Sequence, residues 1–421
     1  MTTKKNNFRK YVVVMAFIFL IFLGISVVIN YLVDPYGLFD SKRVNGFNQL
    51  KPKATRHVRV TKPYLVDVFN PRSIIAGNSR PEIGLDPENS CWPESYRPVF
   101  NLSVPGSSVY MAARYIQHAI AGNEIKQVFW GLDFNDFLND VARNESVVTW
   151  PPVEETFEER LRVRADGSNN DIYYWSKIKD QLTFLFSLDA LADSFNTIVR
   201  QSNERTPTIR RDGYNPAKDF LDIIALEGQG LIFRQTNINT SAMFNKPERT
   251  LFTNNNTSLQ FESVRQLLKF SQKNNVNVVL FINPYHSDYL ETIEIAGLWE
   301  HFLLWKKQLT YLAAEFAVPL WDFSSYNELT NIQPPVIGDN KSILRWFWEP
   351  AHYRKEYGDL ILSQMLNGAC DNSDVMLSGQ LLKPEKLDDY IIKLNEGLNY
   401  YKDIHAEAIE RLLNIVQLRN N

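Results

Sequence analysis

Apolar residues are concentrated in one long run close to the N-terminus of the chain. Residues 11–33 carry no charged side chain, and Asn30 is the only strongly polar one among them. About 20 apolar helical residues span the hydrocarbon core of a bilayer. The run exceeds a signal-peptide core, and no small-residue cleavage site follows it. It predicts an uncleaved transmembrane helix over 11–33, with a long signal peptide as the alternative.

Charges on the two sides of this run predict its orientation. The basic residues before it are Lys4, Lys5, Arg9 and Lys10, and Asp34 follows it. Because positive flanks stay cytoplasmic, we expect residues 1–10 to be a cytoplasmic tail. No later segment is long and apolar enough to span. The chain is therefore expected to be a single-pass protein of a bacterial inner membrane, with a periplasmic domain.

Beyond residue 70 the pattern changes to short β-rich runs separated by helical stretches. The runs cover residues 72–76, 98–102, 127–132, 276–282 and 318–323, and the helical stretches cover 108–121, 258–274, 296–316 and 355–366. Continuous apolar runs are typical of strands buried on both faces, as in a parallel sheet. The alternation predicts a three-layer α/β/α sandwich with a parallel, flavodoxin-like sheet.

The remaining segments complete the expected domain organisation. Residues 34–70 are interpreted as a stalk and approach, and 71–368 as the α/β domain. A polar, aromatic-rich insertion at 138–257 has helical stretches near 170–200 and 215–227. Insertions at strand ends often shape a binding site, but a helical cap without such a role is an equal alternative.

The segment 369–421 is predicted to end in one long helix. Apolar positions recur there at heptad spacing, after Pro384: Leu387, Ile391, Leu394, Leu398, Tyr401, His405, Ala408, Leu412 and Ile415. The helix could associate with another chain, but packing along its own domain is slightly preferred. Gly397 and the polar His405 weaken a tight coiled coil.

Composition narrows the possible partners. A net charge of −3 and a pI near 6.1 give no basic footprint, which argues against nucleic acid. The cysteines and histidines match no zinc spacing, and no glycine-rich phosphate loop is present. We therefore expect no metal and no cofactor. Whether Cys91 and Cys370 form a disulfide is left open.

Two short motifs carry candidate chemistry. The first strand runs into Gly77-Asn78-Ser79, which places a serine at the carboxyl edge of the sheet, where open α/β folds bind ligands. Far downstream, Glu349 precedes His352 by three residues, just before a helical run. A turn there can bring the carboxylate to one ring nitrogen and leave the other as a general base. Taken singly, each motif could be ordinary turn or capping chemistry.

Together the motifs resemble the SGNH (GDSL-like) hydrolase superfamily, and within it the membrane-anchored branch of DltD-like and alginate O-acetylation proteins. Residues 349–353 look like the Asp-Pro-x-His-Tyr signature of that branch, and the resemblance covers about residues 70–137 and 275–368. It implies that Ser79 is the nucleophile, His352 the base and Glu349 the orienting acid. Glu349 replaces the usual Asp.

The resemblance also implies an oxyanion hole, where this chain departs from the family. The backbone N–H groups of Ser79 and Gly106 would be donors, and the family adds an Asn from a Gly-x-Asn-Asp block after the third strand. Here Asp133 occupies that position, and an ionised carboxylate cannot donate. Either Asn135 reaches in, or Asp133 serves another purpose, or the backbone alone forms the hole.

Further residues are expected to line the cleft at the same sheet edge. They are Asn78, Arg80, Asp133, Tyr285, His286 and Trp348. Asn78 stands where the family usually has Asp. His286, with Asp288 nearby, is a second candidate for the base, but His352 fits better by its place in the chain.

These features predict a cell-envelope serine acyl-ester enzyme. The resemblance implies an O-acyl(acetyl)transferase or esterase acting on a polysaccharide or other surface glycan, with a membrane-bound acyl-donor protein as a partner. The alternative is a catalytically inactive SGNH-like component that binds or assembles an exopolysaccharide machine.

Overall fold

The computed structural model describes residues 2–140, 157–203, 205–246, 249–366 and 378–420. Its centre is a six-stranded sheet in the order β10-β7-β6-β3-β1-β2. The strands are β1 (Ser73–Ala76), β2 (Val99–Asn101), β3 (Gln127–Leu132), β6 (Asn277–Ile282), β7 (Leu320–Asp322) and β10 (Gln380–Leu382). The pairs among the first five are parallel, and β10 joins β7 antiparallel.

All five predicted strands are present, so the mixed α/β fold with a mostly parallel sheet is confirmed. Every residue of β1 and β3 is buried, as expected for strands covered on both faces. The five parallel strands follow the 2-1-3-4-5 order of a flavodoxin-like sheet. The antiparallel edge strand β10 was not predicted, because three residues give little periodic signal.

Outside the insertion, the helices of the α/β domain are α3 (Ser79–Gly84), α4 (Val109–Gly122), α9 (Leu259–Lys273), α10 (Ser287–Ile295), α11 (Trp299–Glu315) and α12 (Lys355–Met365). The four helical stretches predicted there correspond to α4, α9, α11 and α12, and the short helices α3 and α10 were not predicted. Ser108 caps α4 by accepting from the Met111 N–H. Two small two-stranded sheets pair β4 (Asn139–Asp140) with β5 (Arg249–Thr250), and β8 (Phe347–Glu349) with β9 (His352–Tyr353).

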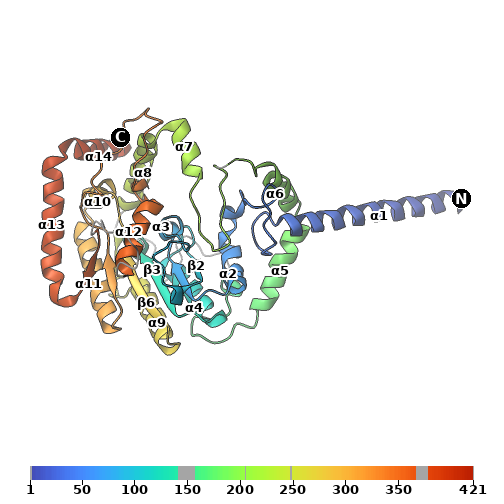
Figure 1. The fold of residues 1–421 in the computed structure, drawn as a ribbon, viewed down its shortest axis with the longest axis horizontal. Helices are drawn as coiled ribbons and strands as arrows, with labels where there is room; N and C mark the ends of the chain where they lie inside the picture. The colour runs from blue at the N-terminus through green and yellow to red at the C-terminus, as the bar shows by residue number, and fades with distance from the viewer. Residues whose placement is uncertain (1, 141–156, 204, 247–248, 367–377, 421) are drawn as a thin grey trace.

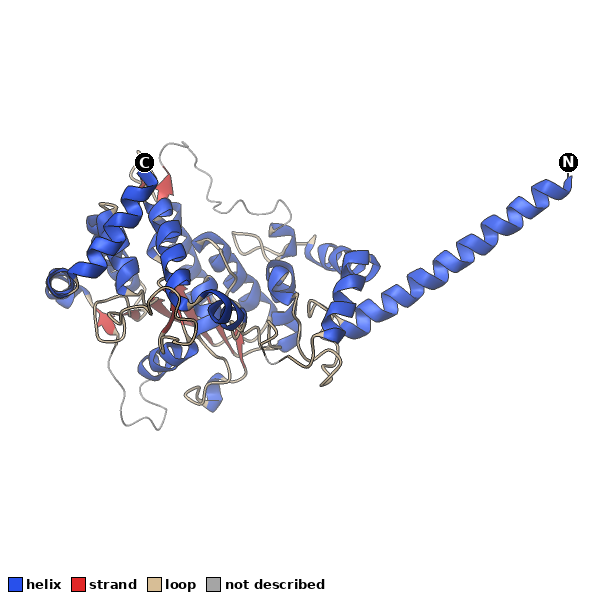
Figure 2. Cartoon of the chain, turned by 90° about the horizontal axis from the view of Figure 1, so that it is seen from above, coloured by secondary structure: helices blue, strands red, loops and turns tan. Residues whose placement is uncertain are grey.

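Helix α1 (Thr2–Val33) projects away from the rest of the molecule in both views (Figures 1 and 2). Its segment Phe8–Val33 is long and apolar enough to cross a membrane, and 6% of its most apolar window is buried. A helix whose most apolar stretch is exposed in this way fits a lipid environment.

The segment 34–70 is not the stalk that the sequence suggested. Its apolar side chains pack into the domain, and α2 (Val58–Phe69) lies against α4. The Asp34 carboxylate accepts from the Leu38 N–H at 2.8 Å, and the buried Lys51 Nζ donates to the Val33 carbonyl at 2.7 Å. These contacts join the end of α1 directly to the folded domain.

The described part of the insertion is mostly helical, and its helices form two groups. Helices α5 (Tyr173–Phe186) and α6 (Leu188–Val199) pack against α1, whereas α7 (Asp219–Glu227) and α8 (Gln229–Phe244) lie near α10 and β8. In Figure 1, α5 and α6 lie at the base of α1, and α7 and α8 lie farther from it.

The predicted C-terminal helix is two helices, α13 (Leu387–Ile404) and α14 (Ala406–Asn420), which meet at His405. The apolar heptad positions from Leu387 to Ile415 are buried. They face α8, α10 and α11 of the same chain, so this face is not free for a coiled coil with another chain. Cys91 is buried, and Cys370 lies outside the described residues.

Candidate active site

Ser79 is placed by a tight turn at the carboxyl end of β1. Gly77 has φ +142°, and a Cβ there would lie 2.7 Å from Pro81 Cγ and 2.9 Å from the Gly131 carbonyl oxygen. Only glycine fits this position. Asn78 then caps α3, because its Oδ1 accepts from the Arg80 N–H at 3.0 Å. The turn leaves Ser79 half-buried as the first residue of α3.

His352 reaches Ser79 from the β8–β9 turn, 273 residues later in the chain. The Ser79 Oγ and the His352 Nε2 lie 2.7 Å apart. On the other side of the ring, His352 Nδ1 hydrogen-bonds Glu349 Oε1. The second oxygen, Glu349 Oε2, accepts from the Ala351 N–H at 2.9 Å. The structure thus brings together the three residues that the sequence singled out, in the order acid, histidine, serine.

Burial and charge differ along this chain of hydrogen bonds. The His352 side chain is 26% exposed, and that of Glu349 is 4% exposed. Burial by itself would raise the pKa of Glu349, but the charge of His352, its hydrogen bond and the Ala351 N–H together lower that pKa below its usual value. Glu349 therefore remains a carboxylate that holds the imidazole in one orientation.

Asp133 is bound in a way that differs from the oxyanion donor expected at this position from the resembled family. Its carboxylate is 1% exposed. It pairs with Arg80 Nη1 at 2.8 Å and accepts from Asn78 Nδ2 at 2.6 Å. Asn283 Nδ2 at 3.1 Å and the Tyr285 hydroxyl at 2.9 Å complete its partners. This arrangement is the second of the three possibilities that the sequence left open.

Arg80 connects this cluster to the histidine turn. Its Nε donates to the Ala351 carbonyl at 2.6 Å. Burial opposes the charge of Arg80, yet the Asp133 carboxylate raises the pKa of the guanidinium well above its usual value. Arg80 is 7% exposed, so it holds α3 against the 349–352 turn rather than lining an open cleft.

The loop that contains Gly106 is attached to the turn that precedes Ser79. The loop after β2 is fixed to Gly77, whose carbonyl accepts from the Val104 N–H and the Ser107 hydroxyl, both at 3.0 Å. Gly106 lies in this loop with φ +63°. Ser79 starts α3, where backbone N–H groups lack intrahelical partners. Asn135 is half-buried in the 3-10 turn Phe134–Phe137 and hydrogen-bonds Asp136.

Two residues expected to line the cleft are fully buried instead. Tyr285 and His286 are both 0% exposed. His286 Nε2 contacts the Ile332 carbonyl at 2.6 Å, and its Nδ1 accepts from the Asp288 N–H at 3.1 Å. Burial lowers the pKa of His286, so it is a neutral residue that caps α10. The sequence shows only a β-rich run followed by a polar turn, and such a pattern does not indicate that Tyr285 and His286 are fully buried.

The insertion supplies contacts that sequence reasoning missed. Phe220 of α7 stacks on Trp348 with ring centroids 5.2 Å apart, and lies 6.5 Å from the His352 ring. Gln229 Nε2 donates to the carbonyls of Phe347 and Trp348 at 2.8 and 3.0 Å. The α7–α8 part of the insertion therefore supports the histidine turn, and no motif marked either residue.

A buried lysine also supports the nucleophile helix. Lys62 Nζ, 0% exposed, donates to Glu82 Oε1 at 2.9 Å and to the Ser103 carbonyl at 2.5 Å. Glu82 lies on α3, and Ser103 lies in the loop that contains Gly106. The pair therefore fixes α3, which begins at Ser79, against the loop that contains Gly106.

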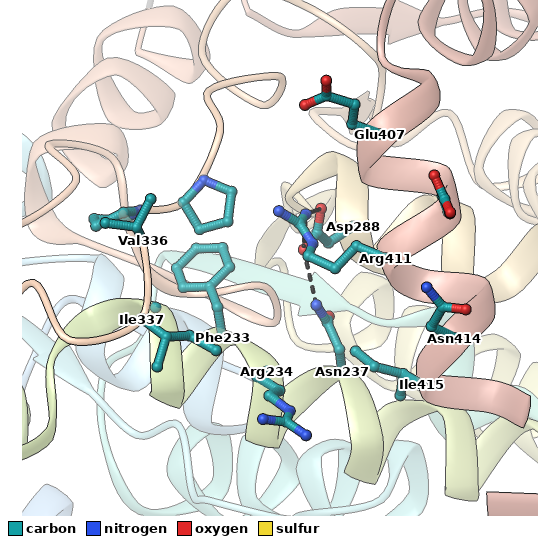
Figure 3. Close-up of a pocket in the computed structure, with 14 residues that line it drawn as sticks. Phe233, Arg234, Asn237, Asp288, Val336, Ile337, Glu407, Arg411, Asn414 and Ile415 are labelled. Atoms are coloured by element: carbon teal, nitrogen blue, oxygen red, sulfur yellow. Dashed lines mark hydrogen bonds and ion pairs between the residues drawn. The ribbon is translucent and has the colours of Figure 1, made fainter. Parts of the chain in front are cut away.

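A separate cavity of about 600 Å³ lies between α8, α14 and the loop 334–337 (Figure 3). Asp288, Asn237 and Arg411 meet on one side of it, and Phe233, Val336 and Ile337 form an apolar wall. The Arg411–Asp288 ion pair is 2.8 Å long. None of Ser79, Glu349 and His352 lines this cavity. We place the candidate chemistry at Ser79, where a hydroxyl, an imidazole and a carboxylate are joined by hydrogen bonds.

One acidic cluster in the described part of the chain has metal-ligand geometry: Asp86, Glu88 and Asp212. Arg210 already supplies a cation to it, 2.6 Å from Asp86 and 3.1 Å from Glu88. This cluster therefore carries no argument for a metal. No family model matches the chain, and no curated protein matches it in sequence.

Proposed function

We propose that this chain is a membrane-anchored serine acyl-ester enzyme, an O-acyl(acetyl)transferase or esterase of the cell envelope. The observation that carries the proposal is the continuous hydrogen-bonded chain from Glu349 through His352 to Ser79. Free serine is a weak nucleophile and needs such a base. Ser79 and His352 are half-buried, so a substrate can reach them, whereas the residues that hold them, such as Glu349 and Arg80, are buried.

In the proposed reaction, His352 Nε2 takes the Ser79 proton as Oγ attacks the carbonyl carbon of an acyl ester. The carbonyl becomes an oxyanion, held by the N–H groups of Ser79 and Gly106, each worth about 3 kcal/mol in the transition state. The bond to the leaving alcohol then breaks, and His352 returns the proton to that alcohol. Water or an acceptor hydroxyl next attacks the carbonyl carbon of acyl-Ser79 and gives its proton to His352. The bond from the acyl carbon to Ser79 Oγ then breaks, and His352 returns the proton to Oγ.

The proposal extends to location and partners. A single span at Phe8–Val33, with the domain on the periplasmic side of a bacterial inner membrane, would place Ser79 near a membrane-borne acyl-donor protein. The acceptor would be a polysaccharide or other surface glycan. The three-layer arrangement of helices about the sheet stays a prediction.

One observation favours the non-catalytic alternative, a binding or assembly component of exopolysaccharide synthesis. Asp133 is committed to Arg80, Asn78, Asn283 and Tyr285. The side-chain oxyanion donor of the resembled family is therefore missing at this position. An SGNH-like site that has only backbone oxyanion donors would turn over substrate more slowly than one that also has a side-chain donor. An inactive member could still keep the fold and bind a partner.

The test uses the full chain purified in detergent. Hydrolysis of p-nitrophenyl acetate and labelling by a fluorophosphonate probe are compared among wild type, Ser79→Ala and Ser168→Ala. Ser168 is an exposed serine in another loop and is the matched control. We expect Ser79→Ala to lose turnover by about 10³-fold or more and to lose the label. Equal rates and equal labelling for the two variants would exclude Ser79 as the nucleophile.

A further inference from the structure

Helices α5 and α6 are fixed to the end of the apolar helix α1. They bend by 66° relative to each other, and both pack on α1. Asn30, 1% exposed, donates to the Leu185 and Ser187 carbonyls at the bend, at 3.0 and 3.1 Å, and accepts from the Ser194 hydroxyl at 3.1 Å. The polar side chain in the apolar run thus ties α1 to the helix pair.

The outward faces of this pair are apolar. On α5 the exposed residues recur every three or four positions: Trp175 at 65%, Ile178 at 48%, Leu182 at 47% and Phe186 at 50%. On α6 they are Leu188 at 65%, Phe195 at 54% and Val199 at 78%, with the exposed Ala192 between them. Each spacing gives one helix face, and we call these eight residues the apolar stripe. Scattered exposed apolar residues are ordinary, but an aligned stripe on two joined helices marks a contact surface.

The length of the span places this stripe at the height of the membrane. Phe8–Val33 has 26 residues, or about 39 Å of helix, against about 30 Å of hydrocarbon. Tyr11 is the first residue after the basic flank. If the about 20 residues that cross the hydrocarbon core begin there, they end near Asn30. Ser26 and Asn30 are both buried, and Asn30 hydrogen-bonds the α5–α6 bend and Ser194 of α6. The helix pair therefore meets α1 inside the apolar run, not beyond it.

We propose that the apolar stripe of α5 and α6 is immersed in the lipid interface beside the transmembrane helix, as a second membrane contact. Its occupant is the bilayer itself, since the surface is continuous with a span that needs lipid. Tyr174 and Trp175 are side chains that favour the interface, and the exposed Lys179 and Arg200 can reach headgroups. The domain would then be held at a fixed height instead of swinging on one helix.

The test measures contact with lipid in the full chain. Leu182→Cys and Phe195→Cys are labelled with a fluorophore that responds to polarity, and the protein is placed in nanodiscs of phosphatidylcholine and phosphatidylglycerol. Tyr311→Cys is the matched control, because Tyr311 is 57% exposed on α11, at the end of the molecule away from α1 (Figure 1). The unsubstituted chain, carried through the same labelling, gives the background.

We expect blue-shifted emission and quenching by bromine-labelled lipid at positions 182 and 195, and neither effect at 311. Labels at 182 and 195 that behave like the one at 311 would overturn the proposal and leave the stripe to a protein partner. The same result is expected if the span tilts to absorb its extra length and leaves α5 and α6 in water, and it would overturn the proposal in that case too. Circular dichroism of each variant shows whether it has folded. The result does not depend on the acyl chemistry.

Discussion

Two buried carboxylates lie on either side of Ser79, and they differ in what their partners can do. Glu349 is 3% exposed and Asp133 is 1% exposed. Glu349 hydrogen-bonds a histidine that continues to a half-exposed serine. Asp133 contacts an arginine, two amides and a phenol. Glu349 leads to an imidazole and a hydroxyl, which can exchange a proton. The partners of Asp133 are a guanidinium, two amides and a phenol, which hold their protons at neutral pH.

The difference shows that burial alone does not give a carboxylate its role. Burial and the nearby Asp133 charge raise the pKa of Tyr285 well above its usual value, so its phenol stays a donor. Arg80 stays charged because the Asp133 carboxylate outweighs burial and raises the pKa of the guanidinium. The Asp133 cluster is therefore a fixed charge network that positions α3, whereas the Glu349 chain can move a proton.

Of the substitutions that test this difference, Glu349→Gln should have the largest effect on activity. The amide can present its N–H₂ group to Nδ1 and so favour the wrong tautomer of His352. We expect kcat for an acyl ester to fall by about 10⁴-fold with little change in the circular dichroism spectrum. Glu356→Gln, which alters a 42% exposed side chain bound to Arg354, is the control. A loss below tenfold would remove Glu349 from the catalytic chain.

Asp133→Asn places at this position the residue found in the resembled family. It removes the charge that faces the buried Arg80. Breaking a buried pair destabilises a protein by about 3–5 kcal/mol, so we expect unfolding at a lower urea concentration and no gain in turnover. A stable variant with faster ester hydrolysis would instead show that Asp133 is a degenerate oxyanion position.

The sequence predicted the sheet and the site to different extents. The five parallel strands were visible because each is a continuous apolar run, and Ser79, Glu349 and His352 were visible because their motifs are local. The role of Asp133 was not, because it depends on Asn283 and Tyr285, about 150 residues away. The stalk was misjudged at 34–70, where buried polar partners such as Lys51 and Asp34 resemble surface residues in sequence.

Phe220→Ala tests whether the α7 part of the insertion helps to position the turn that carries His352. Phe220 stacks on Trp348, beside His352, and such a ring pair contributes about 0.5–1.5 kcal/mol. We expect kcat to fall by up to about tenfold. Leu226→Ala, at an 82% exposed position on the same helix, should leave it unchanged. Equal kcat values for both variants would make α7 a cover without a positioning role.

Asp136→Asn is expected to have the smallest effect, and one that depends on pH. Burial and the Asp133 carboxylate raise the pKa of Asp136 from 3.8 to about 7. Between these values the folded chain binds a proton that the unfolded chain has released, so stability falls as pH rises through this window. The asparagine variant lacks this titration and should lose less stability between about pH 6 and about pH 8, by about 1.4 kcal/mol. Urea unfolding at both pH values measures the difference. Identical pH dependence in the two proteins would show that Asp136 is ionised throughout, and that the charge network around Asp133 tolerates a second carboxylate.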